Sequence, residues 1–278
     1  MKIFNSINEF CNSQLDIESF VPTMGNLHEG HLSLINTAKK NSKNICVSIY
    51  VNENQFTNKK DFDSYPITLD EDIYKLEKAG VNYLLNPCKD DIENNSSPFD
   101  VKFEPKYLTN DLCGKYRKGH FLAVMDIVHR LFQIVNPKNI ILGEKDYQQI
   151  FVIKELIEIC NYNIKIITSP TIREKGSGLA LSSRNSLLTA EQKKMASEIY
   201  KALKLSTILY ADNVPLDQIK DKIYEIFEQL PIEIEYFTFR DLKTLQQAND
   251  NDLIALIAGY LGNVRLIDNI IVKSKTNL

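Results

Sequence analysis

The segment with the clearest chemical potential is residues 22–35, PTMGNLHEGHLSLI, which holds two histidines. His28 and His31 stand three residues apart, and the apolar spacing that follows predicts a helix. Because positions three apart share one face of a helix, both imidazoles can point at one object beside its first turn. The unpaired N–H groups and the dipole of that turn favour phosphate, and Gly25 and Gly30 allow close approach. We therefore expect charge stabilisation on a nucleotide.

Other interpretations of the histidine pair stay open. An H-x-x-H spacing is often a surface accident or a satisfied pair in the core. Histidine is also a common metal ligand, and a metal site predicts stoichiometric zinc in the purified protein. No third ligand in the sequence is spaced to join the pair, which argues against zinc.

A second cluster, VNENQF at residues 51–56, directly follows an apolar, β-branched run at residues 45–51 that predicts a buried strand. Ligands of open α/β sheets bind beyond the carboxyl ends of the strands. Asn52 and Gln55 can both donate and accept hydrogen bonds, which suits the hydroxyl and carboxylate groups of a small polar substrate. An ordinary turn at a strand end is the alternative.

A third cluster, GEKDYQQ at residues 143–149, also lies where a predicted strand passes into a helix. Lys145 can reach a phosphate as a point charge. Asp146 can hold a ribose hydroxyl, orient Lys145 or assist magnesium, and Gln149 shares its helical face. The spacing does not match a P-loop, and a solvated, capped loop is the alternative.

A fourth cluster, GLALSSRN at residues 178–185, places two hydroxyls beside Arg184. Arginine binds phosphate oxygens through two parallel hydrogen bonds, so this is a compact anion site or else a capped surface turn. Arg117, ahead of a predicted helix, binds an anion or belongs to a solvated basic loop. The sequence has no G-x-S-x-G motif and no cysteine with a nearby histidine. The chemistry indicated is positioning and charge neutralisation, as in nucleotidyl transfer.

The elements that must position these clusters alternate in the first part of the chain. Runs at residues 81–85, 139–143 and 163–168 predict further strands, and helices are predicted between them. Such alternation indicates βαβ units and a parallel sheet. Other predicted features are capping boxes at residues 68–71 and 189–192, a loop at 94–98, and helices at 68–79, 121–135 and from the third cluster to about 160.

After about residue 170 the pattern changes to helices followed by strands, which is typical of a smaller α+β domain. We place the domains at residues 1–172 and 173–278. The predicted elements of the second domain are helices at 190–209 and 216–230 and strands at 233–239, 252–260 and 263–272.

Composition excludes several classes of protein. The 278 residues carry a net charge of −3 without a long basic run, which argues against nucleic acid as a partner. No run approaches the ~20 apolar residues of a membrane span, and the N-terminus lacks the apolar core of a secretory signal. The five scattered cysteines include no C-x-x-C, so we expect reduced thiols and a cytoplasmic protein.

Taken together, PTMGNLHEGHLSL, VNENQF, GEKDYQQ, LALSSRN and the terminal GNVRLIDNI resemble the pantoate–β-alanine ligase family, in the family's order. The H-x-G-H element alone resembles only the wider nucleotidyltransferase superfamily. The resemblance implies a Rossmann-like, ATP- and pantoate-binding domain, a smaller C-terminal domain that closes over ATP, and a homodimer. It implies an AMP-forming carbon–nitrogen ligase that joins (R)-pantoate to β-alanine through pantoyl adenylate, with ATP and Mg²⁺ and with release of AMP and pyrophosphate.

The resemblance also implies roles for residues, with the magnesium ligands left unknown. The catalytic set would be His31, His28, Lys145 and Arg184. Gln55 and Gln149 would bind pantoate, with Gln55 also where β-alanine enters. The ATP-binding set would be Met24, Gly25, Asn26, Leu27, His28, Glu29, Gly30, His31, Gly143, Glu144, Lys145, Asp146, the backbone of Ile172, Leu181, Ser182, Ser183 and Arg184.

Three departures from the family pattern affect the expected site. Glu53 stands where a proline is usual, and the loop at residues 173–178 is one residue longer than usual. Asp126 stands where threonine is common, close to Val124, which is expected to line the pantoate pocket. Because an unpaired buried acid is costly, we predict that Asp126 is exposed or paired.

Two other functions remain as alternatives. A nucleotidyltransferase would stop at an adenylated or cytidylylated product, but the Gln55–Gln149 pair suits a small hydroxy acid. A regulatory protein that only binds nucleotide would not need the intact His28, His31, Lys145 and Arg184.

Overall fold

The computed structural model describes residues 1–248 and 252–272, which form two compact units. The first comprises Met1–Glu144 and Gln148–Pro170. The second comprises Lys145–Tyr147 and the described part of Thr171–Leu278. The short segment Lys145–Tyr147 thus belongs with the second unit although its neighbours on both sides belong to the first.

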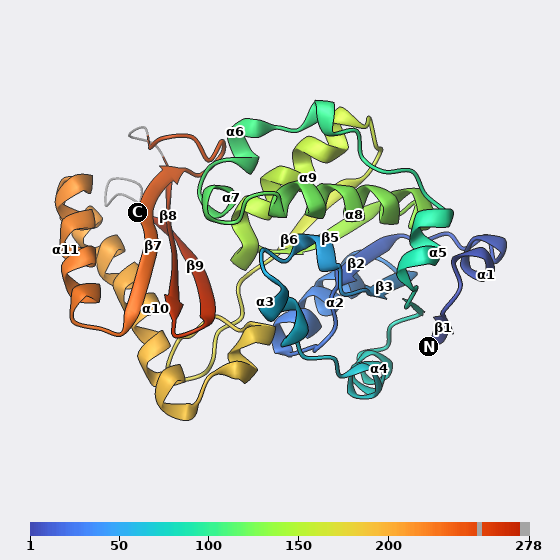
Figure 1. The fold of residues 1–278 in the computed structure, drawn as a ribbon, viewed down its shortest axis with the longest axis horizontal. Helices are drawn as coiled ribbons and strands as arrows, with labels where there is room; N and C mark the ends of the chain where they lie inside the picture. Colours follow the sequence, from blue (N-terminus) through green and yellow to red (C-terminus); the bar gives the residue numbers. More distant parts are fainter. Residues whose placement is uncertain (249–251, 273–278) are drawn as a thin grey trace. The chain divides into compact units, whose positions relative to one another are not determined.

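The first unit is built on a parallel sheet of six strands (Figure 1). Every residue of β3 (Ile45–Ile49) is buried, as expected for a strand that is covered on both faces. The prediction of a parallel sheet is therefore confirmed. In spatial order the strands are β1 (Lys2–Phe4), β4 (Tyr83–Leu85), β3, β2 (Ser19–Thr23), β5 (Asn139–Gly143) and β6 (Lys165–Ser169).

Helices cover both faces of this sheet (Figure 1). On one face, Ile35 of α2 (Glu29–Asn41) and Leu76 of α4 (Leu69–Lys78) join a core with Val21 and Val47 of the central strands. On the other face lie α8 (His120–Val135) and α9 (Tyr147–Ile159). Short helices complete the unit: α1 (Ile7–Asn12), α3 (Lys59–Asp63), α5 (Lys89–Asn94), α6 (Lys106–Thr109), α7 (Cys113–Tyr116) and the 3₁₀ turns η1 (Glu53–Gln55), η2 (Val101–Phe103) and η3 (Glu144–Asp146).

The capping box predicted at the start of α4 is wrong. Thr68 is the N-cap residue, but its side chain accepts no backbone hydrogen bond. Instead its hydroxyl donates to the carboxylate of Asp72 over 3.3 Å. Asp72 is fully buried and needs donors, so it recruits the hydroxyl that an exposed helix would use as a cap.

The second unit combines two helices with an antiparallel sheet of three strands, ordered β7–β8–β9. The predicted capping box forms at the start of α10 (Ala190–Ala211), where Thr189 and Gln192 exchange hydrogen bonds of 3.1 and 3.0 Å. Helices and sheet share one buried apolar core, so the α+β class is confirmed. The other elements are η4 (Ser183–Leu187), α11 (Leu216–Glu228), β7 (Ile232–Asp241), β8 (Leu253–Leu261) and β9 (Val264–Val272).

The loop that looked one residue too long forms a compact hairpin in the second unit. The Leu181 N–H donates to the Ile172 carbonyl over 2.9 Å, and the Glu174 N–H donates to the Leu179 carbonyl over 2.8 Å. Gly178 has a φ of +76°, and a Cβ added there would lie 2.2 Å from the Tyr200 ring. The hairpin therefore depends on glycine at this position.

Replacing Gly178 by alanine should lower the free energy of unfolding by about 2 kcal/mol or more, because the methyl group overlaps Tyr200 and the backbone is left-handed. Gly176→Ala is a matched control, since Gly176 also has a positive φ, +87°, but its Cβ would meet nothing within 4 Å. Urea denaturation of both variants measures the difference. Equal stability of the two would show that the Tyr200 contact costs nothing.

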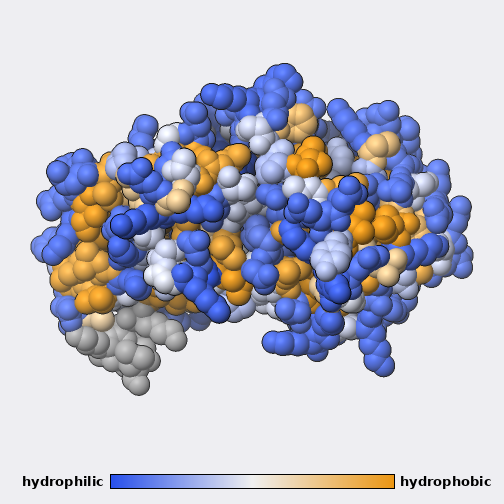
Figure 2. Space-filling model, turned by 90° about the horizontal axis from the view of Figure 1, so that it is seen from below, coloured by the Kyte–Doolittle hydropathy of each residue, from blue (hydrophilic) through white to orange (hydrophobic). Residues whose placement is uncertain are grey.

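The face of the molecule drawn in Figure 2 carries apolar side chains in several places. On the face drawn in Figure 2, the hydrophobic atoms lie in separate groups among hydrophilic ones. Scattered exposed apolar residues are ordinary on folded proteins and by themselves mark no site. Within residues 1–248 and 252–272, none of the helices combines the length and the apolar character needed to cross a bilayer.

Candidate active site

His28 and His31, two histidines of the first unit, lie side by side at the start of α2. His28 is the N-cap residue, with extended backbone, and its Nδ1 accepts the Gly30 N–H over 3.1 Å. His31, at the third helical position, accepts the His28 N–H on its own Nδ1 over 3.4 Å. The ring centroids are 4.2 Å apart. The rings are adjacent as predicted, but the reason differs: His28 precedes the helix, and reciprocal capping rather than a shared helical face brings them together.

For neutral imidazoles, these backbone hydrogen bonds assign the tautomer of each ring. A nitrogen that accepts a backbone N–H carries no hydrogen, so in both His28 and His31 the proton lies on Nε2. The pair thereby supplies two Nε2–H donors at a helix N-terminus. Such donors suit the oxygens of a phosphate group.

The loop between β2 and α2, residues 24–28, is called here the histidine loop, and it begins where the strand order of the sheet reverses. β2 and β5 are neighbours, but the chain leads from β2 through α2 to β3 on one side, and from β5 through α9 to β6 on the other. Ligands of open α/β sheets bind at such a reversal, beyond the carboxyl ends of the strands. Met24 follows β2 there, and Gly143 ends β5.

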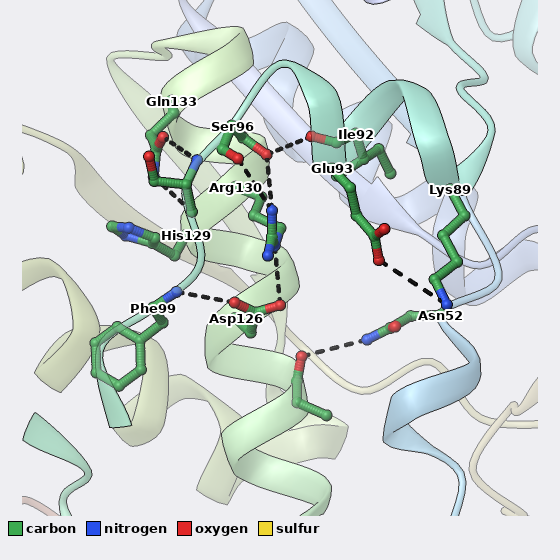
Figure 3. Close-up of polar contacts among 12 residues, drawn as sticks. Asn52, Lys89, Ile92, Glu93, Ser96, Phe99, Asp126, His129, Arg130 and Gln133 are labelled. Carbon is green, nitrogen blue, oxygen red and sulfur yellow. Dashed lines mark hydrogen bonds and ion pairs between the residues drawn. The ribbon is translucent and has the colours of Figure 1, made fainter. Parts of the chain in front are cut away.

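Gln55 lies next to this loop in the first unit. Its Nε2 donates to the Met24 sulfur over 2.7 Å, and its Oε1 accepts from Asn52 over 3.4 Å. Asn52 is buried and also donates to the Ala123 carbonyl over 3.2 Å (Figure 3). The strand-end turn with Glu53 in place of proline is a 3₁₀ turn, η1. The structure therefore brings the predicted pantoate residue to the predicted ATP loop.

Two residues hold the backbone of Gln55 from outside the turn. His120 Nδ1 donates to the Gln55 carbonyl over 2.8 Å, and an Arg117 Nη donates to the same oxygen over 3.2 Å. Arg117 also contacts His120 Nε2 at 2.9 Å. The predicted alternatives for Arg117, an anion site or a solvated loop, did not include this contact, and His120 was not predicted at all. The residues around Arg117 in the sequence do not indicate that its guanidinium binds the carbonyl of Gln55, which lies 62 residues earlier in the chain.

The adjacent glutamines of α9 have different surroundings. Gln148 is buried, donates to the carbonyls of Leu108 and Asp111 over 2.7 and 2.8 Å, and accepts the Cys113 N–H over 3.0 Å. Gln149 is half-buried and makes no side-chain hydrogen bond within the described residues. The side-chain amide of Gln148 is thus used in hydrogen bonds that hold the fold, whereas that of Gln149, the predicted pantoate ligand, is not.

Asp126 is paired, as predicted. One carboxylate oxygen accepts the Phe99 N–H over 2.8 Å, and the other accepts from Arg130 over 3.0 Å (Figure 3). Arg130 in turn donates to the carbonyl of Ser96 over 3.1 Å. The acid that stands where threonine is common therefore anchors, with Arg130, the segment between α5 and η2.

The predicted phosphate ligands of the second unit occupy two segments. In the first, the Lys145 ammonium lies 3.2 Å from both carboxylate oxygens of Asp146, and its side chain is only 18% exposed. Of the three roles predicted for Asp146, orienting Lys145 is the one this contact supports. Asn269 of β9 donates to the Lys145 carbonyl over 3.0 Å, which ties the segment to the second unit.

The other segment follows the hairpin. Ser182 caps η4 by accepting the Arg184 N–H over 3.3 Å, and Ser183 and Arg184 belong to that turn. Asn185 is buried and donates to the Ala180 carbonyl over 3.0 Å. Leu181 and Ile172 pair through their backbones at the hairpin's base. The capped turn is therefore real, and its role in anion binding stays a prediction.

The predicted site residues divide between the two units. His28, His31, Gln55 and Gln149 belong to the first, and Lys145 and Arg184 to the second. Their joint binding of one triphosphate stays a prediction. No set of three or more His, Cys, Asp and Glu side chains in the described part of the chain lies together as a metal-binding group.

Comparisons with known proteins agree with the resemblance in the sequence. The sequence model of the pantoate-beta-alanine ligase family matches residues 2–271. The pantothenate synthetase of Neisseria meningitidis serogroup A is 40% identical over 98% of this chain and 99% of its own, and that of Thermodesulfovibrio yellowstonii is 41% identical over 91% of each.

Solved structures of the same kind share the fold. Pantothenate synthetase from Thermus thermophilus superposes with a TM-score of 0.90, at 32% identity, over 97% of this chain and 99% of its own. Pantoate-beta-alanine ligase from Francisella tularensis, complexed with beta-gamma ATP and beta-alanine, gives 0.80 at 37% identity over 98% and 97%. The chain therefore belongs to the pantoate–β-alanine ligase family and is an enzyme of the ligase type.

Proposed function

We propose that the protein condenses (R)-pantoate with β-alanine to form pantothenate, with ATP cleaved to AMP and pyrophosphate. The observation that carries this proposal is the pair of Nε2–H donors on His28 and His31, in the same unit as Gln55 and next to its Met24 contact. Phosphate-directed donors and neutral amides are what a carboxylate and a triphosphate need together. The complex of the Francisella tularensis ligase with beta-gamma ATP and beta-alanine supports the same substrates.

In the first step a pantoate carboxylate oxygen attacks the α-phosphorus of ATP, and the bond from that phosphorus to pyrophosphate breaks. His31 and His28 donate from Nε2 to the α- and β-phosphate oxygens, where negative charge develops. Lys145 and Arg184 bind the triphosphate as fixed cations. The product is pantoyl adenylate.

In the second step the amine of β-alanine attacks the acyl carbon of pantoyl adenylate, loses a proton, and releases AMP.

Gln55 and Gln149 orient the pantoate hydroxyls and carboxylate through neutral amides. An amide leaves the attacking carboxylate nucleophilic, whereas a cation at the same place would neutralise it. Ile172, Leu181, Ser182 and Ser183 complete the proposed ATP contacts.

Several finer points belong to the same proposal. Mg²⁺ would be held by the triphosphate oxygens and water, which it favours over cages made only of protein, and would neutralise part of their charge. The chain acts as a homodimer in the cytoplasm, as the resemblance implies. The smaller domain, residues 173–278, closes over ATP and excludes water from the adenylate.

The test is product analysis with purified protein. Incubation with ATP and pantoate should give pyrophosphate exchange into ATP, and free AMP should appear only when β-alanine is added. Accumulation of an adenylated product from which β-alanine releases no AMP would identify a nucleotidyltransferase. Tight ATP binding without pantoate-dependent exchange would identify a regulatory protein that only binds nucleotide.

Gln149→Ala should raise the KM for pantoate by about tenfold, since one hydrogen-bonding amide is removed from the substrate, and leave the melting temperature within error. Gln148→Ala is the matched control on the same turn of α9. It should lower the melting temperature, because two carbonyls and one N–H lose their partner, while KM for pantoate in the folded fraction stays unchanged. The reverse assignment of effects would transfer the pantoate role to Gln148.

A further inference from the structure

The loop that carries the histidine pair is held by a carboxylate from another part of the chain. Asp72 of α4 accepts the Asn26 N–H on one oxygen over 2.8 Å and the Leu27 N–H on the other over 2.7 Å. The hydroxyl of Thr68 adds a third donor at 3.3 Å. Asp72 is fully buried, and its bond with the Leu27 N–H forms away from water.

A cation on the same helix holds the next peptide of the loop. Lys75 lies three residues after Asp72, on the same face of α4, and donates from Nζ to the Leu27 carbonyl over 2.8 Å. The N–H at the other end of this peptide belongs to His28 and donates to His31 Nδ1. Lys75 therefore fixes the plane of the peptide that orients the His31 ring.

The loop needs such support because two consecutive residues adopt the left-handed backbone conformation. Gly25 and the non-glycine residue Asn26 both have positive φ values, +76° and +48°. A left-handed conformation costs a non-glycine residue about 1 kcal/mol or more. Once the Asp72 carboxylate is removed, the two N–H groups lose this acceptor and the loop can relax toward other conformations.

We propose that Asp72, assisted by Lys75, is a positioning residue that preorganises the Gly25–His28 loop, so that the His28 and His31 donors are in place before ATP binds. This inference rests on the proposed role of the loop in binding ATP. It deepens that role, because it assigns the rigidity of the nucleotide site to two side chains of α4 that touch no substrate atom in the mechanism above. A preorganised loop loses less freedom on binding, which strengthens affinity.

The test is binding of the ATP analogue β,γ-methylene-ATP, measured by calorimetry on the full chain. Asp72→Asn keeps the volume and one acceptor oxygen but turns an NH₂ group toward a backbone donor. It should weaken analogue binding by about tenfold. It should also raise KM for ATP while KM for β-alanine stays unchanged. Asp70→Asn removes the same charge from an exposed position on the same helix and should bind as the wild type does.

A role confined to stability would lower the melting temperature of Asp72→Asn without changing analogue affinity in the folded protein, and that result overturns the proposal. If Asp72→Asn does not fold, variants of Lys75 test the proposal instead. The Lys75 side chain is 33% exposed, so its replacement should be tolerated by the fold. Lys75→Met should weaken analogue binding and Lys75→Arg should restore it; unchanged binding by Lys75→Met overturns the proposal.

The calorimetric readout is independent of catalysis. If wild-type protein forms no pantothenate, the proposed function fails. The comparison of Asp72→Asn with Asp70→Asn still decides whether α4 positions the nucleotide loop.

Discussion

His31→Ala should reduce the rate of pantoyl adenylate formation on the order of a hundredfold or more, because one preorganised donor to the developing charge is lost. ATP binding should weaken less than turnover, since His28, Lys145 and Arg184 are proposed to remain on the phosphates. Pantoate-dependent exchange of pyrophosphate into ATP measures the first step by itself. The KM and kcat for ATP separate binding from rate.

The variant also removes the acceptor of the His28 N–H, so a control must keep the start of the helix intact. His31→Gln serves this purpose, because glutamine at the third helical position accepts the N-cap N–H in an ordinary capping box. We expect His31→Gln to keep the melting temperature and to lose the rate as His31→Ala does. A glutamine variant with near-normal turnover would limit His31 to capping.

Arg173→Met should give the largest loss of stability, about 3–5 kcal/mol in the free energy of unfolding. Arg173 binds both carboxylate oxygens of Asp268 and lies 3.9 Å from the centroid of the Tyr200 ring. Asp268 is only 4% exposed. Burial raises the pKa of Asp268, and the bonds from Arg173 oppose that rise. Without Arg173 the fold must hold an uncompensated buried carboxylate.

The pH dependence of this loss gives a second readout. A carboxyl group whose pKa is higher in the folded protein than in the unfolded chain destabilises the fold as pH rises through the interval between the two values. The deficit of Arg173→Met in the free energy of unfolding should therefore narrow as the pH falls into the range where the Asp268 carboxyl takes up a proton. Lys201→Met is the control, since Lys201 pairs with Glu198 on the surface of the same unit and should cost about 0–1 kcal/mol. Equal losses in the two variants would contradict the buried-pair account.

The parts of the fold that the sequence predicts well are those with a strong local pattern. The apolar run at residues 139–143 is β5, and the spacing of three and four at residues 121–135 is α8, which extends one residue further at its start. The antiparallel strands of the second unit begin and end within two residues of their predicted bounds. The predicted strand at residues 252–260 begins one residue early, at a position outside β8.

The parts that the sequence does not predict depend on partners far along the chain. The cap at Thr68 is lost to Asp72, whose own partners lie 45 and 46 residues earlier, in the histidine loop. Short helices such as α6 and α7 have no periodicity long enough to detect. The structural role of Arg117 and His120 is seen only from the hydrogen-bond acceptor that they share, the carbonyl of Gln55.

The same limit applies to the candidate site. Motifs located His28, His31, Gln55 and Gln149, because residue types that do chemistry are visible in any sequence. The bonds that orient the histidines involve the backbone, and a sequence does not display which N–H meets which side chain. The catalytic and binding roles of these residues stay predictions until the variants above are measured.

At the beginning of α2, the same two side chains cap the helix and carry the proposed chemistry, whereas most helices use separate residues for these roles. A helix usually starts on serine, threonine, aspartate or asparagine, whose side chain serves only the main chain. Here one nitrogen of each imidazole serves the main chain and the other carries the proton, so the register of the first turn and the aim of both rings are a single property. If the helix began one residue earlier or later, both imidazoles would point in other directions. Replacing His28 by a stronger capping residue would remove one of the two imidazoles.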